Sequence, residues 1–470
     1  MYAMIFSVWG SLLRTMHPCA LFSVCACIAS TTFSVSALSL EYHTDEWALA
    51  DQIVDGIQLP NIPDREFLIT DYHQQSGGDV RPAIMAAIDA AVGAGGGRVV
   101  IPKGEWLSKG PVALQSRINL HLEKGATLKF SPEPEHYLPV VKTRWEGTEL
   151  YTYSPLVYAA NVKDVAITGE GVIDGNAESR FKSWHPKQSA DMQRLRKMGA
   201  KGIPVEKRVF AEGTYLRPPL VQFFHAERVL LEDFTTLNSP FWINHLVYTD
   251  HATVRGIRVE SHFPNNDGVD IESSSNVLVE HSWFRTGDDS VVVKSGRDLD
   301  GRTIGVPSER IVVRNNDMGG EDGIALGSEM SGGIRDVFFT DNVLRNGDSA
   351  FRFKANLDRG GLVENVRLRN LKVESFDNLF WFQLNYPGEL GGFFPSTYQD
   401  IVFENIEVQE VGTFLEVHAP EAAPLKDVLF KGIQVGKVET PMIIENAVNL
   451  EFKEVQLGSQ RIDGVLSWRK

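Results

Sequence analysis

A short strand pattern recurs along most of this chain: a polar residue, usually Asn or Asp, is followed by an apolar-x-apolar run. Regular copies begin at Asp164, Asn276, Asp336, Asn365, Asp400, Asp427 and Asn449, and less regular copies begin at Arg228, Ala252 and Arg310. From Val229 onward, successive copies are 22 to 35 residues apart. A repeat of this length is typical of a solenoid whose coils carry turns of variable length.

The repeats indicate strands rather than helices. Each holds two or three short strands separated by turns rich in Gly, Asn and Asp, and helical periodicity is nearly absent after residue 220. We therefore predict an all-β fold, a single right-handed parallel β-helix with Val, Ile, Leu and Phe stacked inside from coil to coil. A β-sandwich is the alternative, but it does not explain the near-constant repeat.

Two segments differ from the repeat. The stretch from Asp79 to Ala94 is rich in alanine, begins with an Asp cap and runs into three glycines, which predicts a helix that caps the open N-terminal end of the solenoid. The stretch from Lys182 to Arg217 is basic and polar, and we interpret it as a long loop over one face. We assign residues 38–64 to an N-terminal lead-in segment and residues 65–470 to the β-helix domain.

Residues 1–37 have the features of an export signal. The stretch from Cys19 to Val35 is mostly apolar or small, follows Arg14, and leads to Ala37 in a pattern that fits signal cleavage. A membrane anchor or a lipoprotein signal ending at Cys27 is the alternative, but the Ser and Thr residues of the stretch disfavour a membrane span. We expect a secreted or periplasmic protein with no membrane span in its mature chain.

The formal net charge is −15, which argues against nucleic acid as a partner. The same charge does not exclude an anionic substrate, because basic groups in a cleft can oppose the global sign.

Adjacent carboxylates, Asp288 and Asp289, stand at the start of an apolar strand, where two like charges are costly unless they are used. Asp267 lies 21 residues before Asp288, which is about one coil. Neighbouring strands are roughly 4.8 Å apart, so we expect three carboxylates on one face. Hydrolysis of a glycoside with inversion uses such a set: one acid protonates the leaving oxygen, and a carboxylate roughly 6.5–9.5 Å away activates water. We expect no metal ion and no cofactor.

Two cations, Arg352 and Lys354, share one side of a later strand, because alternate residues of a strand point the same way. A solvated edge with scattered charge is the plain interpretation. A receptor for a substrate carboxylate explains the pair better, with Arg as a bidentate fork and Lys as a point charge. Acids that cleave and cations that hold a carboxylate together suggest a polyuronic acid as substrate.

These motifs resemble those of glycoside hydrolase family 28, the polygalacturonases and their pectin-degrading relatives. The family's Asn-x-Asp, Asp-Asp and Arg-x-Lys motifs appear at 265–267, 288–289 and 352–354. Flanking runs also match: GEGVIDG at 169–175, RPPLVQF at 217–223, NSPFW at 238–242, KSGRDLDGRTIGVPSE at 294–309, GSEMSGG at 327–333 and DRGGLVEN at 358–365. The resemblance covers roughly residues 65–455.

The resemblance implies a role for each matching residue. Asp288 would be the general acid, and Asp267 with Asp289 would position the attacking water. The substrate-binding residues would be Arg352, Lys354, Asn265, Lys294, Glu321 and Tyr386.

One motif departs from the family. Glu321 stands where we align the His of the family's Gly-His-Gly segment. A Glu there would add a negative charge and raise the pKa of neighbouring carboxyls.

We therefore expect an exported, monomeric pectin hydrolase that cleaves α-1,4-linked galacturonosyl bonds of pectic polysaccharide or oligogalacturonides with inversion. Loops at 182–217 and 296–308 that wall one end of the cleft would favour exo action. The alternatives are a rhamnogalacturonan or xylogalacturonan hydrolase, a Ca²⁺-dependent polysaccharide lyase on the same fold, and a β-helix that only binds polysaccharide.

Overall fold

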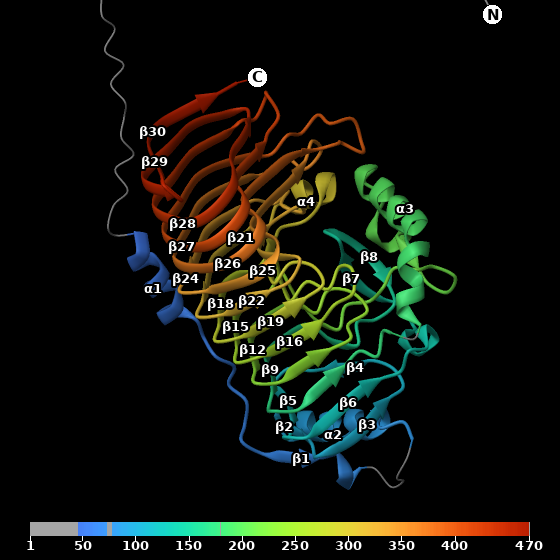
Figure 1. Cartoon of the computed structure of the whole chain (residues 1–470). Coiled ribbons are helices and arrows are strands. Elements are labelled where there is room, and N and C mark those ends of the chain that lie inside the picture. Colours follow the sequence, from blue (N-terminus) through green and yellow to red (C-terminus); the bar gives the residue numbers. More distant parts are fainter. Residues whose placement is uncertain (1–45, 73–77, 179, 470) are drawn as a thin grey trace, which may run out of the picture. The chain divides into compact units, whose positions relative to one another are not determined.

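The computed structural model describes residues 46–72, 78–178 and 180–469, so the predicted export signal at 1–37 lies outside the described residues. The described chain winds into stacked coils whose strands pair in parallel with those of the next coil, as Figure 1 shows. The predicted parallel β-helix is therefore confirmed.

The strands of successive coils form three ladders. The first ladder contains β1 (Glu66–Leu68), β2 (Gly97–Ile101), β5 (Ile118–Leu122), the later parts of β9 (Val157–Thr168) and β12 (Val221–Glu232), β15 (Asp250–Arg255), β18 (Ser275–Glu280), β21 (Ser308–Arg314) and β24 (Ile334–Thr340). The second contains β3 (Gly104–Ser108), β6 (Ala126–Phe130), β10 (Val172–Asp174), β13 (Thr235–Leu237), β16 (Arg258–Ser261), β19 (Trp283–Thr286) and β22 (Asp317–Gly319).

The third ladder carries the candidate site. It contains β4 (Val112–Leu114), the first parts of β9 and β12, β14 (Asn244–Val247), β17 (Val269–Glu272), β20 (Val291–Lys294), β23 (Asp322–Leu326) and the later part of β25 (Val343–Asn356). In the last coils, long strands run through more than one ladder: β26 (Leu362–Tyr386), β27 (Thr397–His418), β28 (Leu425–Glu445) and β29 (Ala447–Leu457).

The repeated Asn and Asp residues turn the chain at one corner of each coil. The seven Asx residues that begin the regular copies have φ between 51° and 57°, a left-handed conformation that Asn and Asp tolerate better than most residues. Several also bond to the corner of the preceding coil; for example, Asn276 Nδ2 donates to Asp250 Oδ1 (2.6 Å) and Asn449 Nδ2 donates to Asp427 Oδ1 (2.7 Å). The corner therefore repeats in register.

The predicted register is confirmed over most of the first ladder. Each apolar residue that follows a corner pairs with its counterpart in the next coil, in the series Val277, Ile311, Val337, Val366, Ile401, Val428 and Leu450. One irregular copy was placed wrongly: Val229 pairs with Ala252, and the left-handed corner before it is His251 (φ 57°). That copy therefore starts one residue earlier than its sequence pattern suggested.

The interior of the coils is apolar and contains a stack of phenylalanines in the C-terminal half. Phe403 and Phe430 stack with ring centroids 5.2 Å apart, and Phe430 stacks on Phe452 at 5.0 Å. Stacked like residues gain both apolar burial and favourable ring contacts.

Helix α2 (Arg81–Gly93) covers the N-terminal end of the coils, which confirms the predicted capping helix. Its buried side chains include Ile84, Ala87 and Ile88. The residue at the N-cap position is Val80 rather than Asp79, although Asp79 Oδ1 accepts a hydrogen bond from the Arg81 backbone N–H (3.0 Å). At the other end, β30 (Gln460–Trp468) pairs antiparallel with β29.

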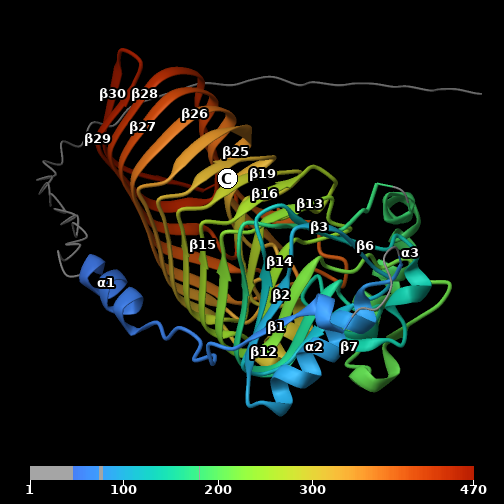
Figure 2. The ribbon, with the colours of Figure 1, turned by 90° about the horizontal axis from the view of Figure 1, so that it is seen from below.

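The lead-in segment contains a helix that the sequence pattern did not predict, α1 (Glu46–Gly56). It lies along the outside of the coils (Figure 2) and buries Ala50 and Ile53 against Leu278, Val312 and Phe338 of the first ladder. Among the described residues, no helix combines the length and the apolar character that a membrane crossing needs.

The basic stretch at 182–217 is not a simple loop. It folds into η3 (Phe181–Lys187), α3 (Ser189–Ala200), η4 (Val205–Lys207) and the short strand β11 (Val209–Phe210). Strands β7 (Val141–Trp145) and β8 (Thr148–Thr152) form a hairpin, and β11 pairs with β8. A small apolar cluster of Trp145, Leu150, Leu195, Phe210, Leu216, Phe241 and Trp242 holds this part together. The remaining short helices are η1 (Ile69–Asp71), η2 (Pro134–Tyr137) and α4 (Asp298–Ile304).

The corner geometry predicts how substitutions of Asn276 change stability. Replacing Asn276 by Ala should lower the free energy of unfolding by about 1–3 kcal/mol, because Ala disfavours positive φ and loses the bonds to Asp250 and Arg310. Asn276→Gly loses the same bonds but adopts this φ freely, so it should be less destabilising. Urea unfolding measures both; equal losses would show that the backbone conformation is not the determinant.

Candidate active site

Three carboxylates occupy the same position in three successive coils. Asp267, Asp289 and Asp322 each lie two residues before a core residue of the third ladder. Those core residues pair with one another from coil to coil: Val269 with Val291, and Val291 with Ile324. The register of the ladder therefore places the three acids in a row.

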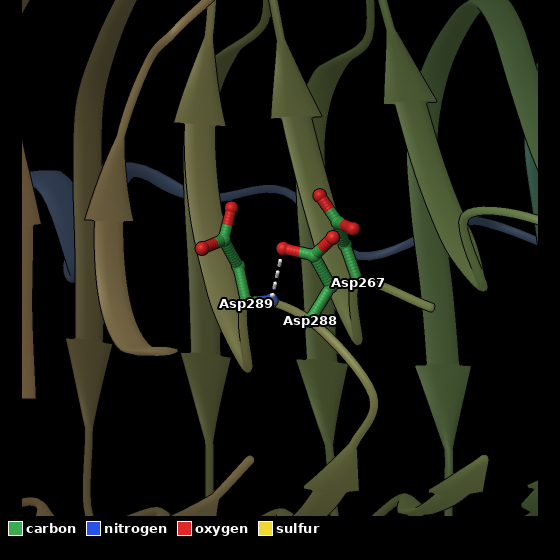
Figure 3. Close-up of side chains that lie close together, drawn as sticks. All are labelled: Asp267, Asp288 and Asp289. Atoms are coloured by element: carbon green, nitrogen blue, oxygen red, sulfur yellow. Dashed lines mark hydrogen bonds between the residues drawn. The ribbon is translucent and has the colours of Figure 1, made fainter. Parts of the chain in front are cut away.

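Asp288 extends this row toward the solvent. Figure 3 shows its side chain beside those of Asp267 and Asp289. One carboxylate oxygen of each of these three residues lies within 4.8 Å of the others, and Asp288 Oδ1 accepts a hydrogen bond from the Asp289 backbone N–H (3.0 Å). Asp267 and Asp289 are buried, whereas Asp288 is partly exposed. The predicted cluster of three acids on one face is present.

The glycine after Asp267 allows the coils to approach at this point. A Cβ on Gly268 would lie 2.4 Å from the backbone oxygen of Ser290 in the next coil. Any larger residue would push the coil of Asp267 away from the coil of Asp288.

Two buried lysines balance part of the negative charge. Lys354 Nζ donates to both carboxylate oxygens of Asp289 (2.8 and 3.0 Å), and Lys294 Nζ lies 3.4 Å from Asp267 Oδ2. Burial opposes the charge of each lysine, but the neighbouring carboxylates, led by Asp289 for Lys354 and by Asp267 for Lys294, raise the pKa of both above the ordinary value. Both lysines therefore remain protonated.

Asp288 differs from its two neighbours in its partners. In the described part of the chain, it forms no ion pair with either lysine, and its side-chain contacts are the Asp289 N–H and, at 3.5 Å, Asn265 Nδ2. Burial and the charge of Asp289 raise the pKa of Asp288, so its protonated form is favoured. Burial and the charge of Asp288 also raise the pKa of Asp267, which Lys294 opposes.

Asn265 is held so that its amide faces Asp288. Its backbone has φ of 61°, and its Oδ1 accepts a hydrogen bond from Arg217 Nη2 (2.6 Å). With the oxygen occupied by Arg217, the NH₂ group is directed toward the acid.

Arg352 lies beside Tyr386, another residue predicted to bind substrate. Its Nη2 donates to Tyr386 Oη (2.8 Å) and to Gln383, and its guanidinium carbon lies 3.2 Å from the centre of the Trp381 ring. Its buried Nη1 has no hydrogen-bond partner in the described residues. A buried donor without a partner is costly.

The segment at 320–323 contributes a residue that sequence reasoning missed. Asp322 is buried, accepts a hydrogen bond from Ser349 Oγ, and lies 3.5 Å from Lys354 Nζ and 3.8 Å from Arg352 Nε. Burial raises the pKa of Asp322 to about 6, against the opposing charge of Lys354. Its offset of two residues before Ile324, the same as for Asp267 and Asp289, is the signal that would have identified it.

Glu321 is exposed beside this row rather than part of it. Partial burial, together with the charges of Asp288 and Asp322, raises the pKa of Glu321 to about 7. Its carboxyl group therefore titrates near neutral pH and changes the charge next to Asp288.

A cavity of about 540 Å³ opens next to the acids. Its lining includes every residue predicted for the site except Arg352 and Glu321. The other lining residues are Glu146, Arg196, Trp242, Arg297, Ser328, Glu329, Asn356, Arg359, Pro387 and Glu389. Ion pairs join several of these lining residues; for example, Arg196 pairs with Glu146 (2.8 Å) and with Glu389 (2.6 Å).

The hairpin β7–β8 covers the third ladder in the coil of Asp267 and in earlier coils. Arg144 Nη1 donates to Ser273 Oγ (2.8 Å) and its Nε lies 3.5 Å from Glu272 Oε1, while Thr143 bonds to Gln222. Trp145 stacks on Phe241 with ring centroids 4.9 Å apart. Residues Gln222 and Glu272 are fully buried beneath the hairpin, so the open face of this ladder ends there.

Comparison with known proteins agrees with these motifs. The family model for Glycosyl hydrolases family 28 matches residues 97–452. A Vitis vinifera protein named "Probable polygalacturonase" is 31% identical over 333 residues, which cover 67% of this chain and 62% of that protein. The "Exo-poly-alpha-D-galacturonosidase" of Dickeya chrysanthemi is 26% identical over 369 residues, 70% of this chain and 59% of that protein.

Among solved structures, an exopolygalacturonase from Thermotoga maritima superimposes with a TM-score of 0.85 at 37% identity, covering 90% of this chain and all of that one. The chain spans about 60% of the length of the Vitis and Dickeya relatives, at 62% and 59%. The family model covers most of the β-helix domain and contains the carboxylate row. The chain belongs to glycosyl hydrolases family 28.

Proposed function

We propose that this protein hydrolyses α-1,4-linked galacturonosyl bonds of pectic polysaccharide. The observation that carries the proposal is the division of lysine contacts in the acid cluster: Asp267 and Asp289 lie against lysines, whereas Asp288 forms no ion pair with either lysine in the described residues. This is the division of labour that acid-assisted hydrolysis of a glycoside needs.

In the proposed mechanism, the Asp288 carboxyl donates its proton to the glycosidic oxygen as the bond from that oxygen to C1 breaks. A water molecule held between Asp267 and Asp289 attacks C1 from the opposite side. Its proton passes to one of these two carboxylates, and the configuration at C1 is inverted.

The geometry of Asp289 favours water activation over direct attack. Both of its oxygens accept hydrogen bonds from Lys354, which lowers their nucleophilicity, and the residue is fully buried. The nearest oxygens of the cluster are within 4.8 Å, closer than the roughly 6.5–9.5 Å expected for an inverting pair. Separation alone therefore does not select inversion, and the proposal depends on the lysine contacts.

The cations beside the cluster suit a uronic acid. Arg352 has a buried, unpartnered Nη1, and Lys294, Arg297 and Arg359 line the cavity. These groups would complement a sugar carboxylate by charge-assisted hydrogen bonds. The names of the relatives, all polygalacturonases or galacturonosidases, support galacturonate as that sugar.

We propose exo action, because the hairpin β7–β8 covers the third ladder at Glu272 and Ser273, in the coil of Asp267, and at Gln222 in an earlier coil. A covered ladder leaves room for a chain end but not for a polymer that continues past the site. The Thermotoga neighbour, named an exopolygalacturonase, supports this mode. We also propose export through residues 1–37, a β-helix catalytic domain at 65–470 and action as a monomer outside the cytoplasm.

Asp288→Asn should lower the release of reducing ends from polygalacturonate by roughly 10²–10⁴-fold, because Asn cannot donate the acid proton. Asp51→Asn, a change of an exposed residue on α1, is the matched control and should leave the rate unchanged. A colorimetric assay of reducing ends at equal protein concentration measures both. Retained activity in Asp288→Asn would rule out Asp288 as the general acid.

The same assay separates hydrolysis from the alternative chemistry. A lyase would form unsaturated products with ultraviolet absorbance and would stop when a chelator removes Ca²⁺. We expect saturated products and no effect of chelator, since Lys294 and Lys354 occupy the positions next to Asp267 and Asp289 that a cation would take. Activity only on rhamnogalacturonan or xylogalacturonan would replace the proposed substrate, and no activity on any pectic polymer would favour a binding protein.

The products should report both stereochemistry and mode of action. Proton NMR during the first turnovers should show the β-anomer released from the α-linked polymer, as inversion requires. Chromatography should show one short product of constant size from the earliest times, as expected of a site closed at one end.

An initial α-anomer would indicate a retaining mechanism with a carboxylate nucleophile. An early mixture of intermediate oligomers would indicate endo action and would contradict closure of the cleft by β7–β8.

Glu321→Gln should shift the alkaline limb of kcat to lower pH by roughly a few tenths of a pH unit. Asp288 acts while protonated, so activity falls as pH rises through its pKa. Ionised Glu321, present above its pKa of about 7, repels the Asp288 carboxylate and keeps the acid protonated to higher pH. Gln removes that charge. A pH–rate profile measures the shift, with Glu105→Gln, an exposed change, as the control.

A further inference from the structure

The segment that interrupts the repeat carries an unusual charge for this protein. Residues 182–208 contain eight lysines and arginines and two acidic residues, in a chain whose formal net charge is −15. Of the cations of this segment, only Arg196 lines the catalytic cavity. The remaining positive charge therefore needs its own explanation.

Three of these cations, Lys197, Lys201 and Lys207, are exposed and lie together. In the part of the chain that the structure describes, none of them forms an ion pair within 4 Å, whereas Arg194 pairs with Asp191 (3.1 Å). Lys197 and Lys201 are four residues apart around the C-terminal end of α3, so like charges face each other. Glu206 is the other acidic residue of the segment and is also exposed.

These lysines border a groove on the outer surface of α3 and the turn that follows it, which we call the basic groove. It has a volume of about 720 Å³ and is lined by Ala190, Gln193, Arg194, Lys197, Met198, Lys201, Ile203 and Lys207. Its lining surface is mostly apolar, and four of its eight lining residues are cationic. A sugar ring presents apolar C–H faces and, in a uronic acid, a carboxylate at its edge, so such a groove complements a polyuronate.

Helix α3 connects the basic groove to the active site. Arg196 pairs with Glu146 and Glu389 in the cavity wall, and Leu195 is buried in the cluster beneath the helix. Lys197, the next residue, is exposed on the groove side. One rigid helix therefore forms a wall of the cavity and presents the basic groove outside it, as its position beside the coils in Figure 1 illustrates.

We propose that the basic groove is a second binding site, which holds an anionic polysaccharide chain outside the catalytic cavity. This inference rests on the proposed function for its ligand, a polymer of galacturonic acid. Binding there raises the local concentration of polymer chain ends at the cavity, because a chain held at one site is tethered close to the other. It affects long polymers and leaves short oligomers, which fill only the cavity, unchanged.

A charge reversal tests the proposal. In Lys197→Glu/Lys201→Glu/Lys207→Glu, the KM for long polygalacturonate at low salt should rise roughly three- to tenfold, since each exposed charge contributes a fraction of a kcal/mol. Hydrolysis of trigalacturonate should keep its kcat and KM. In the wild-type protein, added salt should raise the polymer KM toward that of the variant, because salt screens exposed charges.

The matched control reverses three exposed lysines that lie away from α3 and form no ion pair in the described residues: Lys103, Lys109 and Lys372. It should leave the polymer KM unchanged. A second measurement uses the Asp288→Asn background, in which polymer is not cut: sedimentation with polygalacturonate should weaken when the three groove lysines are reversed.

Four results would overturn the proposal. One is an equal rise of KM for polymer and trigalacturonate, which would show that the lysines act on the electrostatic potential of the catalytic cavity and not through a second site. Another is an equal effect of the control variant, which would assign the effect to net charge. The third is a lower unfolding temperature of the groove variant with no change in polymer binding. It would show that Lys197 and Lys201 only stabilise the C-terminal end of α3 through the helix dipole. The last is lysine-dependent binding to anionic phospholipid vesicles with polymer binding unaffected.

Discussion

The in-register stacking of parallel coils is the constraint on which the rest of the structure depends. The left-handed Asx corners turn every coil at the same place, and their side chains bond to the corner of the preceding coil. Because side chains alternate across a strand, a slip of one residue would exchange the core row of Val291 and Ile324 with the outward row. The same register therefore maintains both the apolar interior and the row of acids beside it.

Stacking acids at one position has an electrostatic cost that the fold compensates locally. Asp289 and Asp322 both face Lys354, and Asp267 faces Lys294. The two lysines come from outward positions of strands in the same ladder, so the ladder supplies the opposing charge as well as the acids. Asp288, at the edge of the row, has neither lysine as an ion-pair partner among the described residues, and its raised pKa is useful for acid catalysis.

The periodic part of this structure was predictable from sequence because its cause is periodic. The Asx corners, the ladder of Val277 and its counterparts, and the stacking of Asp267 with Asp289 all follow from a coil length that the sequence repeats. Asp322 was missed because alignment with the family's Gly-His-Gly segment points to Glu321, whereas the offset of two residues before Ile324 identifies Asp322. The ladder offset was the better guide, since it depends on geometry alone.

The non-periodic parts were not predictable, and they are the parts that shape the cavity. Hairpin β7–β8, α3 and α4 are held by contacts between residues far apart in sequence, such as Trp145 with Phe241 and Arg208 with Asp300 (2.8 Å). No local sequence pattern predicts such long-range pairs. The core residues set the register of the ladder and thereby the positions of its acids, whereas insertions at its turns can change freely. In this architecture the repeated strands therefore position the catalytic acids, and the insertions determine the length and charge of the substrate chain that can bind.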